Sequence, residues 1–233
     1  MMLRLPRGFA FLLCLAPVSV SFGQTNWQVD ATIGGAGGSG TAADPYTSVQ
    51  YAIDQPTTLD GDRLVLAAGT FAESAVISGK ALRIRPAGGA VVTWKPQGTD
   101  PALVVTGSTT VPVQVNGIVF EAPGAAPPGP DLDLVRVQNA GALACFGCRF
   151  EVLTQSWCCL RVIDSALLMH DCELVCDDGC AEGLGLWGTN SAVTIRDSNL
   201  TGHAQDSPSL VLVEGGSLLR VESSTLDAYG YGV

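Results

Sequence analysis

The stretch AVTIRDSNL, residues 192–200, decides the fold because close copies of it recur along the second half of the chain. Its second, fourth and last positions are apolar, which is the alternation of a β-strand, and Asp197 marks a tight turn inside it. The copies start 24, 26 and 26 residues apart, at 142–150, 166–174, 192–200 and 218–226. A repeat of this length is typical of a stacked solenoid, so each copy is interpreted as part of one coil of a β-solenoid.

The pattern extends toward the N-terminus in weaker form. Residues 111–120 align with the first clear copy. Two shorter strands upstream show the same alternation, and their spacing predicts that Leu82 stacks on Leu64 and Ile84 on Leu66. A stretch rich in Pro, Gly and Ala at 122–130 is expected to be a protruding loop.

A short helix is expected at residues 47–54, just after Pro45. A hydroxyl residue supplies the N-cap, and Val49, Ala52 and Ile53 form one apolar face. Such a helix would cover the apolar interior and the unpaired strand edge of the first coil.

The first residues of the chain indicate secretion. Residues 8–20 form an uncharged run after Arg4 and Arg7, so residues 1–23 are interpreted as a signal peptide, and the mature protein as extracellular or periplasmic. The run is too short to span a membrane comfortably, and no later segment reaches that length. Residues 24–44 are interpreted as a glycine-rich, irregular lead-in, and residues 45–233 as a single parallel β-helix domain.

The stack stops at Val233 without a polar cap, although terminal repeats normally need one. Further coils of the same chain are therefore expected beyond Val233, and the domain is interpreted as truncated.

The chain is acidic, with a formal charge of −10 that becomes −12 once Arg4 and Arg7 leave with the signal peptide. A surface of this sign repels phosphates, so a nucleic-acid partner is not expected. Acidity of this kind keeps an extracellular protein soluble.

The opening of the mature chain resembles a known family. The motifs are GSGTAADPYTSVQYAI at 38–53 and GDRLVLAAGTFAE at 61–73. They are similar to the start of secreted right-handed parallel β-helix proteins of the pectin-lyase-like group, including uncharacterised modules with the pattern GT…PF.TI..AI…GD.V.V..G.Y.E. The resemblance implies an all-β, right-handed parallel β-helix, but not one activity, because lyases, hydrolases and modules without a known reaction share this opening. No catalytic motif of these enzymes can be matched residue by residue.

Several outward charges are explained by stacking alone. Equivalent residues of neighbouring coils lie about 4.8 Å apart. Arg149 is therefore expected beside Glu173, and Arg196 beside Glu222, as stabilising pairs. His170 is interpreted as structural, although it could act as a base if a substrate lay along its face. His203 has no defined partner.

Arg136 and Arg161 are the candidate binding residues, because they lie outward at nearly equivalent places on neighbouring coils. Like charges at this distance repel, and guanidinium groups match the oxyanions of uronate or sulfate. The alternative is that a nearby carboxylate neutralises them. The candidates for that role are Asp131, Asp133, Glu151 and Asp164.

Seven cysteines remain after signal removal, all within residues 145–180. Disulfides suit a secreted protein better than zinc, because the CFGC spacing at 145–148 has no second pair and these side chains point into the stack. The expected contacts are Cys148 with Cys172, and Cys158 or Cys159 with the turn that holds Cys176 and Cys180. Because seven is an odd number, at least one cysteine is expected to stay free or to bond to another chain.

A calcium site is a weaker interpretation of Asp177, Asp178 and Glu182, because calcium wants about 6–8 oxygen ligands. A solvated acidic turn is favoured, and no other cofactor is expected.

Two functions stay open. The first is a secreted module, non-catalytic as it stands, that interacts with polysaccharide or the cell surface. The second is the N-terminal part of a polysaccharide lyase or glycoside hydrolase, with Arg136 and Arg161 as substrate contacts and the catalytic coils beyond Val233.

Overall fold

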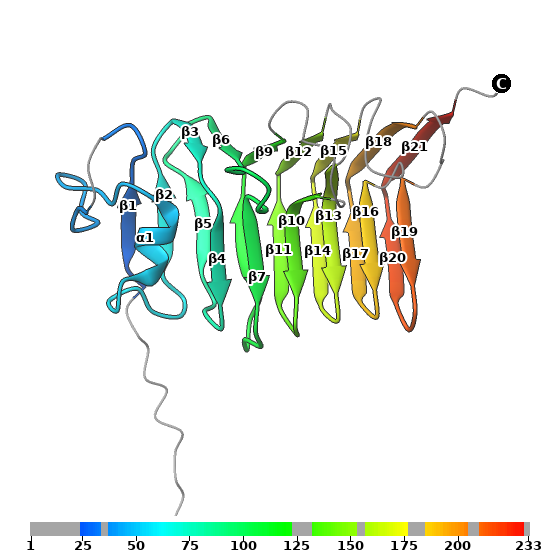
Figure 1. The fold of residues 1–233 in the computed structure, drawn as a ribbon, viewed down its shortest axis with the longest axis horizontal. Coiled ribbons are helices and arrows are strands. Elements are labelled where there is room, and N and C mark those ends of the chain that lie inside the picture. The colour runs from blue at the N-terminus through cyan, green and yellow to red at the C-terminus, as the bar shows by residue number, and fades with distance from the viewer. Residues whose placement is uncertain are drawn as a thin grey trace, which may run out of the picture.

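The computed structural model describes residues 24–33, 37–122, 132–152, 157–176, 185–204 and 210–230. Over these residues the chain winds into a parallel β-solenoid of about five turns, whose coils follow one another along the long axis (Figure 1). The predicted fold, an all-β parallel β-helix with a short N-terminal helix, is confirmed. The predicted signal peptide lies outside the described residues, as does nearly all of the predicted loop at 122–130. Within them, no helix is long and apolar enough to cross a membrane.

Three parallel sheets form the sides of the solenoid. Sheet A contains, in order, β1 (Asn26–Val29), β2 (Arg63–Leu66), β5 (Arg83–Pro86), β8 (Val113–Asn116), β11 (Ala142–Phe146), β14 (Ala166–His170), β17 (Ala192–Arg196) and β20 (Leu218–Glu222). Sheet B contains β3 (Gly69–Ala72), β6 (Val92–Lys95), β9 (Val119–Glu121), β12 (Arg149–Val152), β15 (Glu173–Cys176), β18 (Asn199–Ala204) and β21 (Thr225–Gly230). Sheet C contains β4 (Ala75–Ser78), β7 (Leu103–Thr106), β10 (Leu132–Gln138), β13 (Trp157–Ile163), β16 (Leu186–Thr189) and β19 (Val211–Glu214).

The register of the clear repeats agrees with the sequence. Ala142 pairs with Ala166, Ala166 with Ala192, and Ala192 with Leu218, so the copies at 142–150 onward stack in place. The predicted turn position adopts the left-handed backbone conformation in every copy, which Gly and Asp tolerate better than most residues. Its φ values are 59° at Gly147, 54° at Asp171, 49° at Asp197 and 48° at Ser223.

The predicted register of the first coils is wrong by two residues. Leu64 pairs with Ile84, not with Leu82, and Leu66 pairs with Pro86. A shift of two residues leaves every side chain on the same face of the strand, so alternation alone does not detect it.

Part of the expected irregular lead-in is also ordered strand. β1 pairs in parallel with β2 and so extends sheet A by one strand. The Nε1 of Trp27 donates to the buried Asp62 carboxylate at 2.9 Å, and Asp62 also accepts from the backbone N–H groups of Thr25 and Leu59. These bonds join the segment before the glycine run to the first coil.

Helix α1 (Val49–Asp54) lies at the N-terminal end of the stack and packs against β1 and β4 (Figure 1). Its apolar face is buried, as expected, and Ser48 is the N-cap, accepting from the N–H of Tyr51 at 3.0 Å. The Glu73 carboxylate accepts the remaining free N–H groups of the first turn, from Val49 at 2.8 Å and Gln50 at 3.1 Å. Glu73 therefore fixes the helix to the coil that it covers.

Replacing Glu73 by alanine is expected to lower the free energy of unfolding by about 2 kcal/mol, because two partly buried helix N–H groups lose their acceptors. Urea denaturation followed by circular dichroism measures this loss. An exposed carboxylate on the same helix, Asp54, supplies the control, and its replacement by alanine should cost less than about 0.5 kcal/mol. Equal effects of the two substitutions would contradict the anchoring role.

The same anchor predicts a pH dependence. Burial raises the pKa of Glu73 above its usual 4.5, although the bonds from Val49 and Gln50 oppose this rise. A carboxyl with a higher pKa in the folded state stabilises that state fully below the unfolded pKa, and the gain is lost as pH rises through the folded pKa. Because glutamine does not titrate, the stability of the wild type minus that of Glu73→Gln should fall as pH rises from below 4.5 to neutral. Unfolding free energies of both proteins across this range test the sign.

The core is a set of inward ladders, of which the largest is aromatic. Trp94, Phe120 and Phe150 are fully buried and lie in register on β6, β9 and β12. The ring centroids of Trp94 and Phe120 are 5.6 Å apart, and those of Phe120 and Phe150 are 5.3 Å apart. Leu174 continues this ladder on β15.

A second ladder follows the turn position. The side chains of Cys148, Cys172, Ser198 and Ser224 each donate to the carbonyl two residues earlier. The Oγ of Ser198 also accepts from the N–H of Cys172, and the Oγ of Ser224 accepts from the N–H of Ser198. The two serine hydroxyls thereby supply acceptors for the backbone N–H groups of Cys172 and Ser198 at the turn.

Candidate functional site

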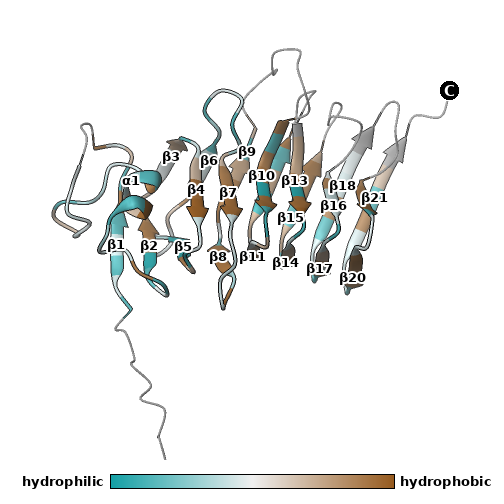
Figure 2. Ribbon diagram, turned by 60° about the horizontal axis from the view of Figure 1, so that its bottom comes forward, coloured by the Kyte–Doolittle hydropathy of each residue, from teal (hydrophilic) through white to brown (hydrophobic). Residues whose placement is uncertain are grey.

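The predicted binding residues lie on the outer face of sheet C. On β10 the inward Val135 and Val137 flank Arg136, and on β13 the inward Leu160 and Val162 flank Arg161. Figure 2 shows hydrophilic and hydrophobic colours alternating along both strands. Such alternation turns one set of side chains into the core and the other outward.

Arg136 and Arg161 are in direct register on neighbouring strands, as the sequence predicted. The same row continues on β16, where Arg161 pairs with Trp187. The guanidinium carbon of Arg161 lies 4.4 Å from the centre of the Trp187 ring, which is the geometry of a cation–π contact. We call Arg136, Arg161 and Trp187 the sheet C cluster.

A buried carboxylate joins the two arginines. Asp133 has no exposed surface, and its Oδ2 accepts from the Nε of Arg136 at 2.5 Å while its Oδ1 lies 2.6 Å from the Nε of Arg161. Neutralisation, the alternative reading of the arginine pair, is thus shown for Asp133. Of the other three candidates, Glu151 pairs with Arg149 at 3.3 Å, Asp164 makes no ion pair within the described residues, and Asp131 lies outside them.

Two effects act on the pKa of Asp133 in opposite directions. Burial raises the pKa of this carboxyl above its usual value, and the charges and hydrogen bonds of Arg136 and Arg161 oppose the rise. The carboxylate orients both guanidinium groups, because one oxygen accepts a hydrogen bond from Arg136 and the other forms an ion pair with Arg161.

The members of the cluster differ in exposure. The side chain of Arg161 is 18% exposed, whereas that of Arg136 is 32% exposed. The indole Nε1 of Trp187 donates to Glu214 at 3.1 Å, and Glu214 also accepts from the hydroxyl of Thr189. Arg161 is therefore held between Asp133 and an oriented indole, and Arg136 offers the more accessible guanidinium.

The predicted stacking pairs form on other faces. Arg149 contacts Glu173 at 2.8 Å, and Arg196 contacts Glu222 at 2.7 Å. His170 lies on sheet A, where its Nε2 is 3.3 Å from Asp197, close to the ring of Phe146. This position agrees with a structural role. The side chain of His203 lies outside the described residues.

The predicted disulfide between Cys148 and Cys172 is not found, because both are free thiols. Cys159 is free as well, and Cys158 keeps its thiol, which donates to the carbonyl of Leu160, so neither forms the predicted bond to the following turn. The stack accommodates buried thiols as small side chains that donate to carbonyls. Cys176 is not among the free thiols, and Cys180 lies outside the described residues.

These thiols are not arranged for chemistry. Burial and neighbouring thiols raise the pKa values of Cys148, Cys159 and Cys172 above the usual value, which disfavours the reactive thiolate. Among the described residues no group of three or more His, Cys, Asp or Glu side chains could hold a metal ion. The calcium candidates Asp177, Asp178 and Glu182 lie outside those residues.

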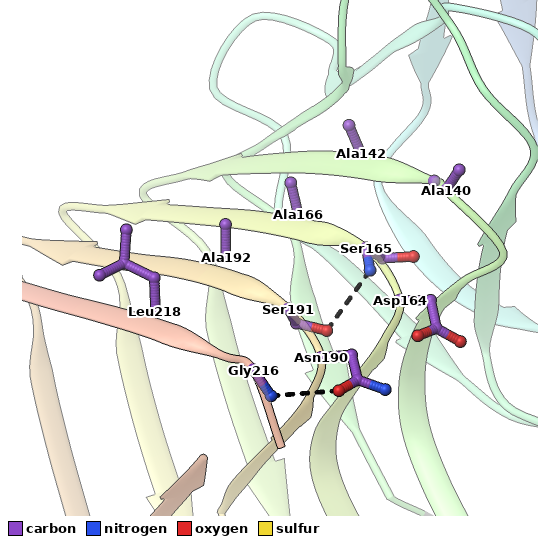
Figure 3. A pocket seen from close by; sticks show the side chains of 11 residues that line it. Ala140, Ala142, Asp164, Ser165, Ala166, Asn190, Ser191, Ala192, Gly216 and Leu218 are labelled. Carbon is purple, nitrogen blue, oxygen red and sulfur yellow. Dashed lines mark hydrogen bonds between the residues drawn. The ribbon is translucent and has the colours of Figure 1, made fainter. Parts of the chain in front are cut away.

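A groove of about 470 Å³ follows the corner between sheets C and A. Figure 3 shows that short side chains line it, with Ala142, Ala166 and Ala192 in a row and Leu218 after them. The hydroxyl of Ser191 accepts from the N–H of Ser165 and donates to the carbonyl of Thr189. The Ser191 hydroxyl is bonded to backbone groups and not to a general base, so it is not activated as a nucleophile.

No protein-family model matches this chain, and neither does any curated protein. The resemblance to the pectin-lyase-like group therefore stays a prediction from the opening motifs.

Proposed function

We propose that this protein is a secreted β-solenoid module that binds polysaccharide or another saccharide component of a cell surface through the sheet C cluster. As it stands, it binds without catalysing a reaction. The observation that carries the proposal is the row of Arg136, Arg161 and Trp187 on three neighbouring strands, with Arg161 stacked on the indole. The charge-free run before residue 24 supports secretion.

The chemistry of this row suits a sugar chain. An indole offers a flat apolar surface to the C–H face of a sugar ring, and a guanidinium donates to carboxylate, sulfate or hydroxyl oxygens. The three residues follow one another at the spacing of parallel strands, about 4.8 Å. An extended polymer that crosses the strands would meet a cation, a second cation and then an aromatic face.

The catalytic alternative has less support from the positions of the side chains. A lyase needs a base near the acidic carbon of the substrate and a cation that neutralises the substrate carboxylate at the same place. The histidine placed by the repeat, His170, lies on β14 of sheet A, whereas the arginine pair lies on sheet C. These groups therefore face different sides of the solenoid.

The test is the binding of short oligogalacturonates, measured by titration calorimetry, to the wild type and to Trp187→Ala. We expect the substitution to lower affinity about tenfold, since a stacking surface and the orientation of Arg161 are lost together. Leu212→Ala changes the next residue in the same row and is the matched control, with an expected change below about twofold.

Two results would overturn the proposal. One is an affinity that is equal in the wild type and Trp187→Ala. The other is the appearance of unsaturated or new reducing ends during incubation with uronate polymers, which would favour the lyase or hydrolase alternative.

A further inference from the structure

The arginines of β2 and β5 differ from the other cations of the chain. Six of the described Lys and Arg side chains pair with carboxylates, namely Lys95, Arg136, Arg149, Arg161, Arg196 and Arg220. Lys80 donates to backbone carbonyls of the helix region. The remaining cations, Arg63, Arg83 and Arg85, make no ion pair with a described residue.

These three arginines share one face. Leu64, Leu66 and Ile84 are fully buried, so the alternation of β2 and β5 turns the arginines to the outside of sheet A. Arg63 pairs in register with Arg83, and Arg85 lies two residues further along β5. Strand geometry therefore places the three backbone positions about 5–8 Å from one another.

The residues in register with these arginines on the flanking strands β1 and β8 are uncharged. Asn26 lies beside Arg63 on β1, and Gln114 lies beside Arg83 on β8. Arg63 donates to the side-chain oxygens of Asn26 at 3.1 Å and Gln24 at 3.0 Å, which orient its guanidinium without neutralising it. Arg83 and Arg85 are exposed.

A structural role accounts for the aliphatic stems of these arginines but not for their charged guanidinium groups. On the outer face of β2, Val65 lies in register with Gln28 and Arg85 and is only 7% exposed. Long polar side chains cover apolar surface with their aliphatic stems. Covering a valine does not require a charged head, and two like charges in register on adjacent strands destabilise a sheet. In a chain with a formal charge of −10, it is unusual that no described carboxylate pairs with any of these three arginines.

We propose that Arg63, Arg83 and Arg85 form a binding site for the sulfate or carboxylate groups of an acidic polysaccharide. This site is separate from the sheet C cluster, because it lies on another sheet and nearer the N-terminal end of the stack (Figure 1). Guanidinium groups bind such oxyanions with paired hydrogen bonds, and the flanking amides both donate and accept, as sugar hydroxyls require.

The charge of the whole chain favours this ligand over nucleic acid. Duplex DNA carries about one negative charge per 1.7 Å, and a strongly acidic protein repels such a dense polyanion over its full length. A polysaccharide carries its oxyanions further apart, so a local cationic site can bind a few of them with less repulsion. An acidic peptide lacks the hydroxyl groups that the flanking amides fit.

The experiment compares two double variants that remove the same charge from the same sheet. Arg83→Gln with Arg85→Gln removes the unpaired cations, whereas Arg196→Gln with Arg220→Gln removes cations that pair with Glu222. Binding to chondroitin sulfate and to polygalacturonate is measured at about 50 mM salt, where surface charges are weakly screened. We expect at least a tenfold loss of affinity in the first variant, less than a threefold loss in the second, and a shallower salt dependence in the first.

Thermal unfolding of both variants verifies that they fold. Equal losses in the two variants would show an effect of net charge and overturn the proposal, and so would no loss in either. Tighter binding of polyglutamate, single-stranded DNA or anionic lipid vesicles than of both glycans would overturn it as well. The outcome is independent of the proposed function, because Trp187→Ala leaves this site intact and the arginine variants leave the sheet C cluster intact.

Discussion

Replacing Phe120 by alanine is expected to lower the free energy of unfolding by about 3–5 kcal/mol, the range for large aromatic side chains in a core. Phe120 is fully buried and stacks on both sides, against Trp94 and Phe150. Its removal therefore takes away two ring contacts in addition to the transfer free energy of the side chain. Urea denaturation of the purified protein, followed by tryptophan fluorescence, measures the loss.

The cavity that Phe120→Ala leaves in the core should stay open. The coils are held at a fixed spacing by the parallel hydrogen bonds of β6, β9 and β12, so Trp94 and Phe150 cannot close the gap by moving together. Phe120→Leu keeps most of the volume and should cost about 1–2 kcal/mol. Val119→Ala, in the outward position next to it, is the control for the strand itself. A loss below about 1 kcal/mol for Phe120→Ala would show that the aromatic ladder does not support the stack.

The sequence predicts the later coils well because each carries two independent signals. The alternation gives the face of each side chain, and the turn residue, such as Asp171 or Asp197, gives the position along the strand. The early coils lack the second signal. Leu64 and Ile84 show the right alternation, but an error of two residues preserves it, and the predicted register failed in that way.

The candidate site also contains residues that the sequence predicted and residues that it did not. The register of Arg136 and Arg161 follows from alternation on neighbouring coils and was predicted. In the strand alternation, Asp133 has the same parity as the inward Val135. Burying a carboxylate at such a position is unfavourable unless it is paired, and the structure supplies the two arginine partners. Trp187 lies 26 residues after Arg161, the same distance as between the copies at 166–174 and 192–200, so the repeat itself carried the signal that places it in this row.

Arg63, Arg83 and Arg85 have no carboxylate partner among the described residues, and the sequence did not predict this. Sequence alternation places these side chains outward, but it does not say which carboxylates approach them. Arg149 and Arg196 lie in clear repeats with a carboxylate at the equivalent position of the next coil, so their pairs were predicted from the sequence. The first coils lack such a clear repeat, so only the structure shows which described residues lie beside Arg63, Arg83 and Arg85.

Replacing Asp133 by alanine is expected to cost about 3 kcal/mol of unfolding free energy, since removing one member of a buried charge group leaves the others uncompensated. The substitution removes the carboxylate oxygens that lie 2.5 Å from Arg136 and 2.6 Å from Arg161, while both arginines remain only partly exposed. Urea denaturation near neutral pH measures the cost.

Two further variants separate charge from hydrogen bonding. Asp133→Asn keeps the size and one acceptor oxygen, so it should cost less than Asp133→Ala. Replacing Asp133 by alanine together with Arg136 by methionine removes one of the two stranded cations and should recover part of the loss, because an apolar replacement of a buried ion pair is often tolerated. No recovery in the double variant would indicate that the carboxylate acts through Arg161 and not through Arg136.

The Asp133 substitution also connects stability to binding. If Asp133 orients Arg136 and Arg161 toward a ligand, Asp133→Asn should weaken oligogalacturonate binding at a temperature where the variant is fully folded, although neither arginine has been changed. A purely structural carboxylate would lower the unfolding free energy and leave the affinity of the folded protein as it was. Measuring both quantities on one sample therefore decides whether the buried carboxylate serves the fold alone or also orients the sheet C cluster.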